Sequence, residues 1–105
     1  MSREIRLELE AEEELRQAAR WYDQRRPGLG SEFLSAVAAA FSLLAEQPTL
    51  GAPVPGVRTD LPTRRVLLRR FPYAIVFLEV DATVRILAIA HQRRRPGYWI
   101  ERLRR

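Results

Sequence analysis

The stretch from Thr83 to Trp99 constrains the fold more than any other part of the chain. Its first part, TVRILAIAH, alternates apolar side chains onto both faces of an extended segment. A segment that is apolar on both faces is typical of an interior strand of a sheet. The chain's only histidine, His91, therefore lies where this buried strand ends. An arginine triplet and two aromatic residues follow it: Arg93, Arg94, Arg95, Tyr98 and Trp99.

Two helices are expected before this stretch. Residues 3–9 alternate between apolar and charged side chains, which predicts a short half-buried strand with Leu9 on its apolar side. From Ala11 the apolar residues recur at helical spacing, until a turn that contains proline and glycine ends the helix. Ser31 is the expected N-cap of a second helix, which stops at Gln47, so the two helices form an antiparallel hairpin. The expected inward stripes are Ala11, Leu15, Ala18, Ala19 and Tyr22 in the first helix, and Phe33, Val37, Ala40, Phe41 and Leu44, widened by Leu34 and Ala38, in the second.

A loop and three strands complete the predicted order. Proline and glycine punctuate residues 48–63, which predicts a loop. The order is β-α-α-β-β-β(-α), which predicts an α+β fold with the helical hairpin packed on a small, mainly antiparallel sheet in a single domain, residues 1–105. The expected strands are 65–69, 73–80 and 83–91, and the short terminal helix begins at Pro96 and is docked by Trp99 and Leu103.

Composition excludes several kinds of chemistry. The chain has no cysteine and one histidine, so disulfides, thiolate catalysis and a multi-histidine metal site are excluded, and no cofactor is expected. The amino terminus is charged, and no segment approaches the uninterrupted apolar length of a membrane span. We therefore expect a cytoplasmic protein with no membrane partner.

Positive charge is concentrated in the second half of the chain. Every basic residue is an arginine. Residues 1–46 carry six arginines and nine acidic residues, a net charge of −3, whereas residues 47–105 carry twelve arginines and four acidic residues, a net charge of +8. A basic half indicates an acidic partner, either a nucleic acid or an acidic protein segment. Codon bias accounts for the missing lysine but not for the asymmetry.

An acidic run opens the first helix. The run consists of Glu12, Glu13 and Glu14. One interpretation is a metal-binding or catalytic carboxylate cluster, and the other is a solvated helix start. Adjacent residues on a helix point in different directions, and carboxylates favour the positive end of the helix dipole. The pattern therefore favours the solvated helix start.

Several short motifs, in their order and spacing, resemble one known family over nearly the whole chain. The chain is similar to the RelE/ParE superfamily of type II toxin–antitoxin toxins, often labelled plasmid stabilisation proteins. The resemblance implies a cytoplasmic toxin that is neutralised by a cognate antitoxin. The motifs are Ala18 to Trp21-Tyr22, Leu29-Gly30 before Phe33, Pro48, Arg70-Phe71-Pro72-Tyr73, Ile86 to His91, and Arg94 with Pro96, Tyr98 and Trp99.

The resemblance implies one of two activities, and the residues bear on the choice. ParE-like members poison DNA gyrase and are not known to be enzymes, whereas RelE-like members cut mRNA on the ribosome. RNA cleavage needs proton transfer and cations that stabilise the phosphorane, and several RelE-like members use lysines that this chain lacks. A nuclease here would depend on His91 and Tyr98 for proton transfer and on arginines such as Arg65 for charge, because arginine is a poor base. The "FPY" segment and the His-x-x-Arg-x-Pro tail resemble the ParE side, which we favour.

The remaining candidates are partner-binding residues. Aromatic residues beside arginines suit nucleic-acid stacking or an acidic helix with apolar anchors. For His91 the alternative is a hydrogen-bonded strand end, for the arginine triplet a solvated tail, and for Trp21 and Tyr22 a core or helix-hairpin contact. For Arg65, Arg69 and Arg70 the alternative is solvation; Arg65 and Arg69 would share a face of the expected strand, and bracing of the turn at Pro72 is a further alternative for Arg70. The hypotheses are a gyrase-directed toxin, a ribosome-dependent endonuclease and an inactive member that only binds its antitoxin. The predicted target- or partner-binding residues are Arg69, Arg70, Arg93, Arg94, Arg95, Tyr98 and Trp99.

Overall fold

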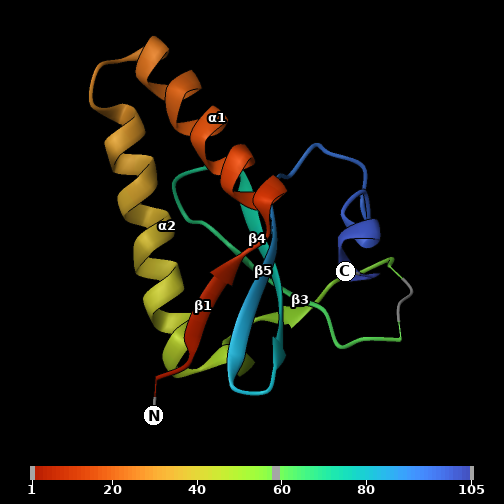
Figure 1. The fold of residues 1–105 in the computed structure, drawn as a ribbon. Coiled ribbons are helices and arrows are strands. Elements are labelled where there is room, and N and C mark those ends of the chain that lie inside the picture. The colour runs from red at the N-terminus through yellow and green to blue at the C-terminus, as the bar shows by residue number, and fades with distance from the viewer. Residues whose placement is uncertain (1, 58–59, 105) are drawn as a thin grey trace.

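The computed structural model describes residues 2–57 and 60–104, and its fold is α+β (Figure 1). The predicted order of strand, two helices and three strands is confirmed, and two of the strands have the predicted bounds. A short extra strand and a 3-10 turn lie within the predicted loop 48–63, whose residues 58–59 are outside the described part. The elements are β1 (Glu4–Leu7), α1 (Leu9–Arg25), α2 (Leu29–Glu46), η1 (Pro48–Leu50), β2 (Ala52–Pro53), β3 (Arg64–Leu67), β4 (Tyr73–Val80), β5 (Thr83–His91) and η2 (Ile100–Arg104).

The sheet is mainly antiparallel, as predicted, and its strand order is β1-β5-β4-β3-β2. The strand β5 lies in the interior of the sheet between β4 and β1, and its pairing with β1 is parallel. This pairing ends where Leu7 lies opposite Ile86, because the chain then turns into α1. The second half of β5 therefore has a strand neighbour on the β4 side alone, within the part of the chain that the structure describes.

Both faces of the sheet are covered, each by a different part of the chain. The helical hairpin packs on one face, where the predicted stripe residues Phe33 and Val37 are buried against Ile75. The C-terminal segment returns across the other face, where Trp99 and Leu103 are buried (Figure 1). The predicted docking of these two residues is confirmed, but the segment is the 3-10 turn η2 rather than a helix from Pro96. The second core comprises Val76, Leu78, Leu87, Ala88, Ala90, Trp99 and Leu103.

The ends of both helices differ from the prediction. The helix α1 begins at Leu9, so this residue is 77% exposed in the first turn instead of lying on the inner side of a strand. The helix α2 begins at Leu29 after Gly28, whose φ of 89° lies in the left-handed region, so Ser31 is not the N-cap. The stripe of α2 is also narrower than expected, because two of its predicted members are exposed: Leu34 and Ala38.

The apolar character of α2 departs from one further expectation. With 18 residues and a mean hydropathy of 1.3, it is long and apolar enough to cross a membrane by length and composition alone. Core helices pass the same test, and α2 buries Phe33, Val37 and Leu44 against α1 and the sheet. The expectation that no segment approaches the apolar length of a membrane span therefore does not hold for α2 by length and composition alone.

The hairpin between β4 and β5 allows a test of local backbone strain. Asp81 and Ala82 have φ of 50° and 62°, as in a type I′ turn, whose second position favours glycine. We expect Ala82→Gly to raise the free energy of unfolding by up to about 1 kcal/mol, because glycine has no Cβ to strain there. Urea unfolding measures the change. Ala39→Gly, on the exposed side of α2, is the control and should lower stability by about 1 kcal/mol; a loss at both positions would contradict the prediction.

Candidate functional site: an arginine pocket beside an apolar groove

The first hollow, the arginine pocket, lies on the sheet face that the C-terminal segment covers. It is small, with a volume of about 130 Å³. Strand pairing places Arg65 of β3 opposite Val76 of β4, and paired residues point to the same face of a sheet. The C-terminal segment, residues 92–104 and called the tail from here on, turns back over this face after His91. Among the residues that line the pocket are Arg65, His91, Arg94, Arg95, Tyr98 and Trp99, over a floor of Ala74, Val76 and Ala90.

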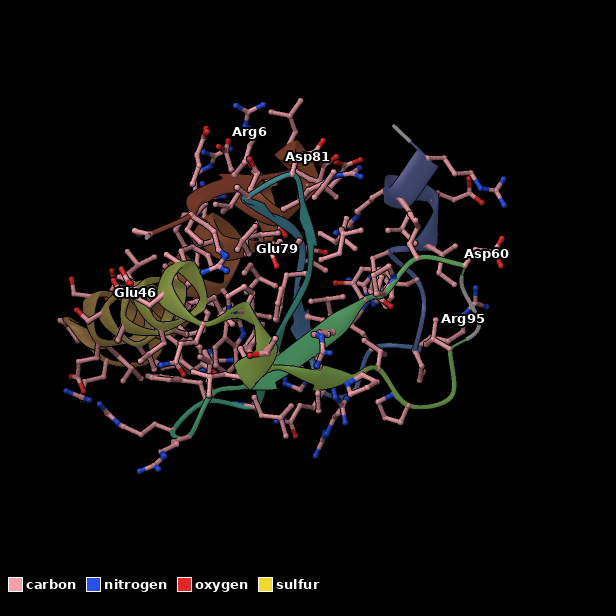
Figure 2. The ribbon with its side chains drawn as sticks, turned by 90° about the horizontal axis from the view of Figure 1, so that it is seen from below. Arg6, Glu46, Asp60, Glu79, Asp81 and Arg95 are labelled. Carbon is pink, nitrogen blue, oxygen red and sulfur yellow. The ribbon has the colours of Figure 1, made fainter. Side chains whose placement is uncertain are left out.

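Positive charge is uncompensated in and beside this pocket. Within residues 2–57 and 60–104, no ion pair involves the side chains of Arg65, Arg93 or Arg95. Arg94 stacks its guanidinium 3.9 Å from the ring centre of Tyr98. Figure 2 shows Arg95 and η2 at one side of the molecule and Glu46, at the end of α2, at the opposite side. A cluster of this kind attracts anionic groups of a partner.

Two predicted arginines lie elsewhere. Arg69 and Arg70 follow β3, which ends at Leu67, so Arg69 does not share a strand face with Arg65 as expected. Arg70 donates to Glu32 of α2 at 2.6 Å, and this hydrogen bond helps to lower the pKa of the Glu32 carboxyl. Neither residue lines the arginine pocket or the groove described below.

His91 stands at the border between the two hollows. Its Nδ1 accepts a hydrogen bond of 3.0 Å from the backbone N–H of Arg93, and its ring meets Tyr73 edge-on with centroids 5.1 Å apart. Because Nδ1 is an acceptor, the neutral ring carries its proton on Nε2. The open side of the ring is thus a hydrogen-bond donor and lacks the lone pair that a general base needs.

Tyr98 lines the arginine pocket with its ring, but its hydroxyl is engaged elsewhere. The O–H donates to Glu14 Oε2 at 2.7 Å. Burial, and then the hydrogen bond and charge of Glu14, raise the pKa of Tyr98 far above its ordinary value. A hydroxyl that is already bonded and this hard to ionise is poorly suited to transferring a proton to a substrate.

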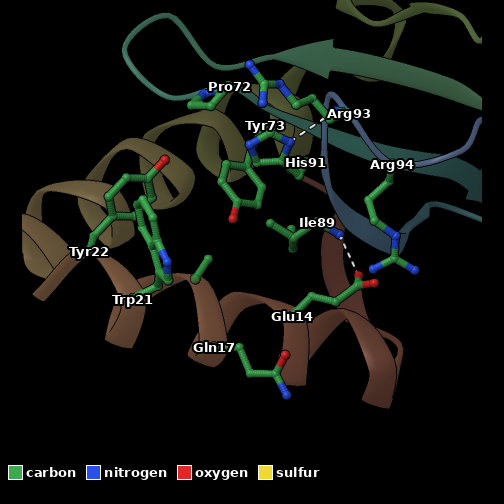
Figure 3. A pocket seen from close by; sticks show the side chains of 11 residues that line it. Glu14, Gln17, Trp21, Tyr22, Pro72, Tyr73, Ile89, His91, Arg93 and Arg94 are labelled. Carbon is green, nitrogen blue, oxygen red and sulfur yellow. Dashed lines mark hydrogen bonds between the residues drawn. The ribbon is translucent and has the colours of Figure 1, made fainter. Parts of the chain in front are cut away.

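The second hollow, the apolar groove, lies between α1 and the end of β5 (Figure 3). Its volume is about 790 Å³. Trp21 is 47% exposed there and carries the guanidinium of Arg25 at 4.1 Å from its ring centre. Of the two residues predicted as core or helix-hairpin contacts, Tyr22 is in the core and Trp21 is not, because successive helical residues point about 100° apart. The lining residues include Ala18, Trp21, Tyr22, Pro72, Tyr73 and Ile89, with His91, Arg93 and Arg94 at one end.

Comparison with known proteins decides the family. A family model described as the ParE toxin of the type II toxin–antitoxin system parDE matches residues 5–96. The chain belongs to this family. It is a type II toxin of the ParE/RelE superfamily, as the sequence motifs predicted. No curated protein sequence matches the chain significantly.

Solved structures share the fold of this ParE family member at low sequence identity. The chromosomal ParDE system from P. aeruginosa is 18% identical, with 86% of this chain and 96% of that chain covered and a TM-score of 0.70. The toxin–antitoxin complex RelBE2 from Mycobacterium tuberculosis is 24% identical, with coverage of 87% and 99% and a TM-score of 0.57. The ParE family match ends at residue 96, so Tyr98 and Trp99 lie beyond it.

Glu14 organises the tail of this ParE family toxin, although the acidic run predicted a solvated helix start there. Its carboxylate is bonded to the tail and to β5. The position of Glu14 could have revealed this, because it lies three residues after Ala11 and four before Ala18, on the edge of the buried stripe. Glu13 points outward to Arg16 as expected. Arg102 was missed as well, and no pattern in the sequence marks it.

The raised pKa of Tyr98 predicts a loss of stability in alkali. Below about pH 10 the hydroxyl is neutral in both folded and unfolded chains. Above that value the unfolded chain loses the proton while the folded chain keeps it, so the free energy of unfolding falls as pH rises. We expect the fall, measured by urea unfolding between about pH 9 and about pH 11, to be shallower in Tyr98→Phe. Part of it should remain, because the pKa values of Tyr22 and Tyr73 are also raised; an unchanged slope would contradict the assignment.

Proposed function

We propose that this toxin inhibits DNA gyrase without being an enzyme itself, and that the arginine pocket contacts the target. The observation that carries the proposal is that, among the described residues, the arginine pocket gathers guanidinium groups that have no ion pair, while the Tyr98 hydroxyl and the His91 Nδ1 are each occupied by a hydrogen bond. Tyr98 donates to Glu14, and His91 accepts a hydrogen bond at Nδ1. The site is therefore better suited to binding an anionic surface than to acid–base catalysis. One structural neighbour is a ParDE system, which agrees with this choice.

The proposed protein partner is a cognate antitoxin that acts in the cytoplasm and neutralises the toxin. Both structural neighbours are described as toxin–antitoxin systems or complexes. We expect an acidic or amphipathic segment that orders on binding, because the toxin's second half is basic and disordered chains can wrap a large surface. Failure to co-purify at moderate salt with the product of the adjacent gene would contradict this pairing.

A supercoiling assay with purified gyrase tests the target. The wild-type toxin should inhibit supercoiling, and a variant with Arg65, Arg94 and Arg95 all changed to glutamine should need about tenfold more protein for the same inhibition. The control changes Arg6, Arg16 and Arg20 to glutamine, which removes the same charge from arginines that pair with surface glutamates, and it should retain potency. His91→Ala should weaken inhibition less than the triple variant, because the guanidinium groups remain in place. No inhibition and no cleavage complexes at stoichiometric excess of wild type would overturn the proposal.

A second candidate function is a ribosome-dependent mRNA endonuclease. It is favoured by one observation, that Arg65, His91 and Tyr98 line the same pocket. Programmed ribosomes should then yield mRNA cut in the A site, and His91→Ala should abolish this product.

An inactive member that only binds its antitoxin would leave bacterial growth unimpeded when it is overproduced alone.

A further inference from the structure

The second half of β5 has an edge without a strand on the side where β1 ends, within the part of the chain that the structure describes. Two side chains fill the place of that strand. Glu14 Oε1 accepts a hydrogen bond from the backbone N–H of Ile89 at 3.0 Å (Figure 3), and Arg102 Nη1 donates to the carbonyl of Leu87 at 2.8 Å. An N–H and a C=O two residues apart on one strand edge are the groups that a neighbouring strand would pair. The helix α1 and the tail together therefore close this edge.

The two side chains are also bonded to each other. Arg102 donates from Nη1 to Oε1 and from Nη2 to Oε2 of Glu14, each at 3.0 Å. Tyr98 adds its hydroxyl to Oε2 at 2.7 Å. The Arg102 side chain is 12% exposed and that of Glu14 16%. We call this arrangement of Glu14, Tyr98 and Arg102 the carboxylate lock; it brings three side-chain donors and one backbone donor to a single carboxylate.

The carboxylate lock is connected to the arginine pocket through the ring of Tyr98. The hydroxyl end of that ring is fixed by Glu14, and its face supports the guanidinium of Arg94 at 3.9 Å. Trp99 follows directly and is buried in the second core. A change in the direction of the Tyr98 ring would therefore move Arg94, which has no ion pair of its own among the described residues.

We propose that Glu14 is a positioning residue for target binding: it holds the tail against the edge of β5 and thereby sets the place of the arginine side chains. The role of the arginine pocket in this inference rests on the proposed function. The bonding of the tail by Glu14 does not depend on the proposed function, so the two parts of the inference are tested separately. A buried ion pair adds little net stability when compared with apolar packing, so its expected effect is on the geometry of the tail.

The first experiment measures the tail of the isolated protein. In Glu14→Gln, the amides of Ile89, Ile100 and Arg102 should exchange with solvent about tenfold faster or more, because the Ile89 amide loses its charged acceptor and the turn that contains Ile100 and Arg102 is no longer held by the carboxylate. In a Trp21→Phe background, Trp99 is the only tryptophan and is 2% exposed. Iodide should therefore leave the fluorescence of this background almost unchanged and quench it once Glu14→Gln is added. Unchanged exchange and quenching would overturn the inference.

Two controls separate a local effect from general destabilisation. Glu13→Gln makes the same change one residue earlier, where the carboxylate pairs with Arg16 and Arg20 at the surface. Ile75→Val weakens the core under the helices without touching the tail. Neither should change exchange at Ile89 or quenching of Trp99 beyond its effect on global unfolding. If Glu14→Gln does not fold, Tyr98→Phe removes one lock bond, keeps the ring, and should give the same pattern at smaller amplitude.

The second experiment measures gyrase inhibition at equal concentrations of folded protein. The concentration for half inhibition should rise about tenfold in Glu14→Gln and stay unchanged in Ile75→Val and Glu13→Gln. A loosened tail with unchanged potency would overturn the positioning role. If the wild type fails to inhibit gyrase, the proposed function and the positioning role both fail, and the exchange data still decide whether Glu14 holds the tail.

Discussion

Replacing Gly30 with alanine is expected to lower the free energy of unfolding by about 3 kcal/mol. Gly30 lies in the first turn of α2, where the hairpin brings it against α1. A Cβ at this position would lie 2.4 Å from the carbonyl oxygen of Ala19 and 2.7 Å from the carboxyl carbon of Asp23. The Asp23 carboxylate is held in place because it accepts the N–H of Gly30 at 2.7 Å. Because the Ala19 carbonyl oxygen belongs to the backbone of α1, α1 and α2 must move apart to accommodate the added Cβ.

Gly28→Ala is the matched control for this prediction. Gly28 has a φ of +89° but nothing within 4 Å of an added Cβ, so its replacement introduces backbone strain without a clash. The expected loss is about 1 kcal/mol. Urea unfolding of both variants measures the difference. If Gly30→Ala is no more destabilising than Gly28→Ala, the close approach of the helices does not contribute as argued.

The sequence was sufficient for the two long helices and the two long strands, because each has one dominant pattern, but it did not predict β2 or η1. The strands at Tyr73–Val80 and Thr83–His91 were predicted with their bounds, since each is a run of strand formers that is apolar on both faces and the short Asp81-Ala82 turn separates them. The ends of the helices were harder to predict. Gly28 and Gly30 look alike in sequence, yet one provides a left-handed backbone before α2 and the other provides space inside it. That distinction depends on how α1 packs, which a local pattern does not contain.

The candidate site was predictable only in part, for a related reason. Arg70 was predicted to bind a partner together with the arginine triplet, but it reaches Glu32 on α2. Arg65, which was predicted only for a nuclease, lines the same pocket as Arg94 and Arg95. The strand pairing decides this, not the spacing. Glu14 and Arg102 are far apart in sequence, and their contact depends on the tail returning over the sheet.

The two hollows share residues because β5 ends between them. His91 and Arg94 line both the arginine pocket and the apolar groove, on either side of the point where the tail leaves the sheet. A partner bound in one hollow therefore contacts side chains that also line the other hollow. Both hollows depend on the position of the tail, which is set by the carboxylate lock through Tyr98 and Arg102 and by the second core through Trp99 and Leu103.

Trp99→Ala tests the contribution of that second core and should lower the free energy of unfolding by about 3–4 kcal/mol. Trp99 is 2% exposed and packs with Val76, Leu87 and Leu103, so its removal leaves a cavity under the tail. Trp21→Ala is the control, because Trp21 is 47% exposed and its replacement should cost about 1 kcal/mol or less.

Urea unfolding measures both changes, and gyrase inhibition by the folded fraction of Trp99→Ala measures the consequence for the site. In Trp99→Ala the tail should lose its fixed position even if the helical hairpin and the core beneath that hairpin persist, because the two cores lie on opposite faces of the sheet. A Trp99 variant as stable as Trp21→Ala would show that the tail adds little to the fold. The arginines would then be carried by a segment with no fixed position, and the proposed preorganised surface would be wrong.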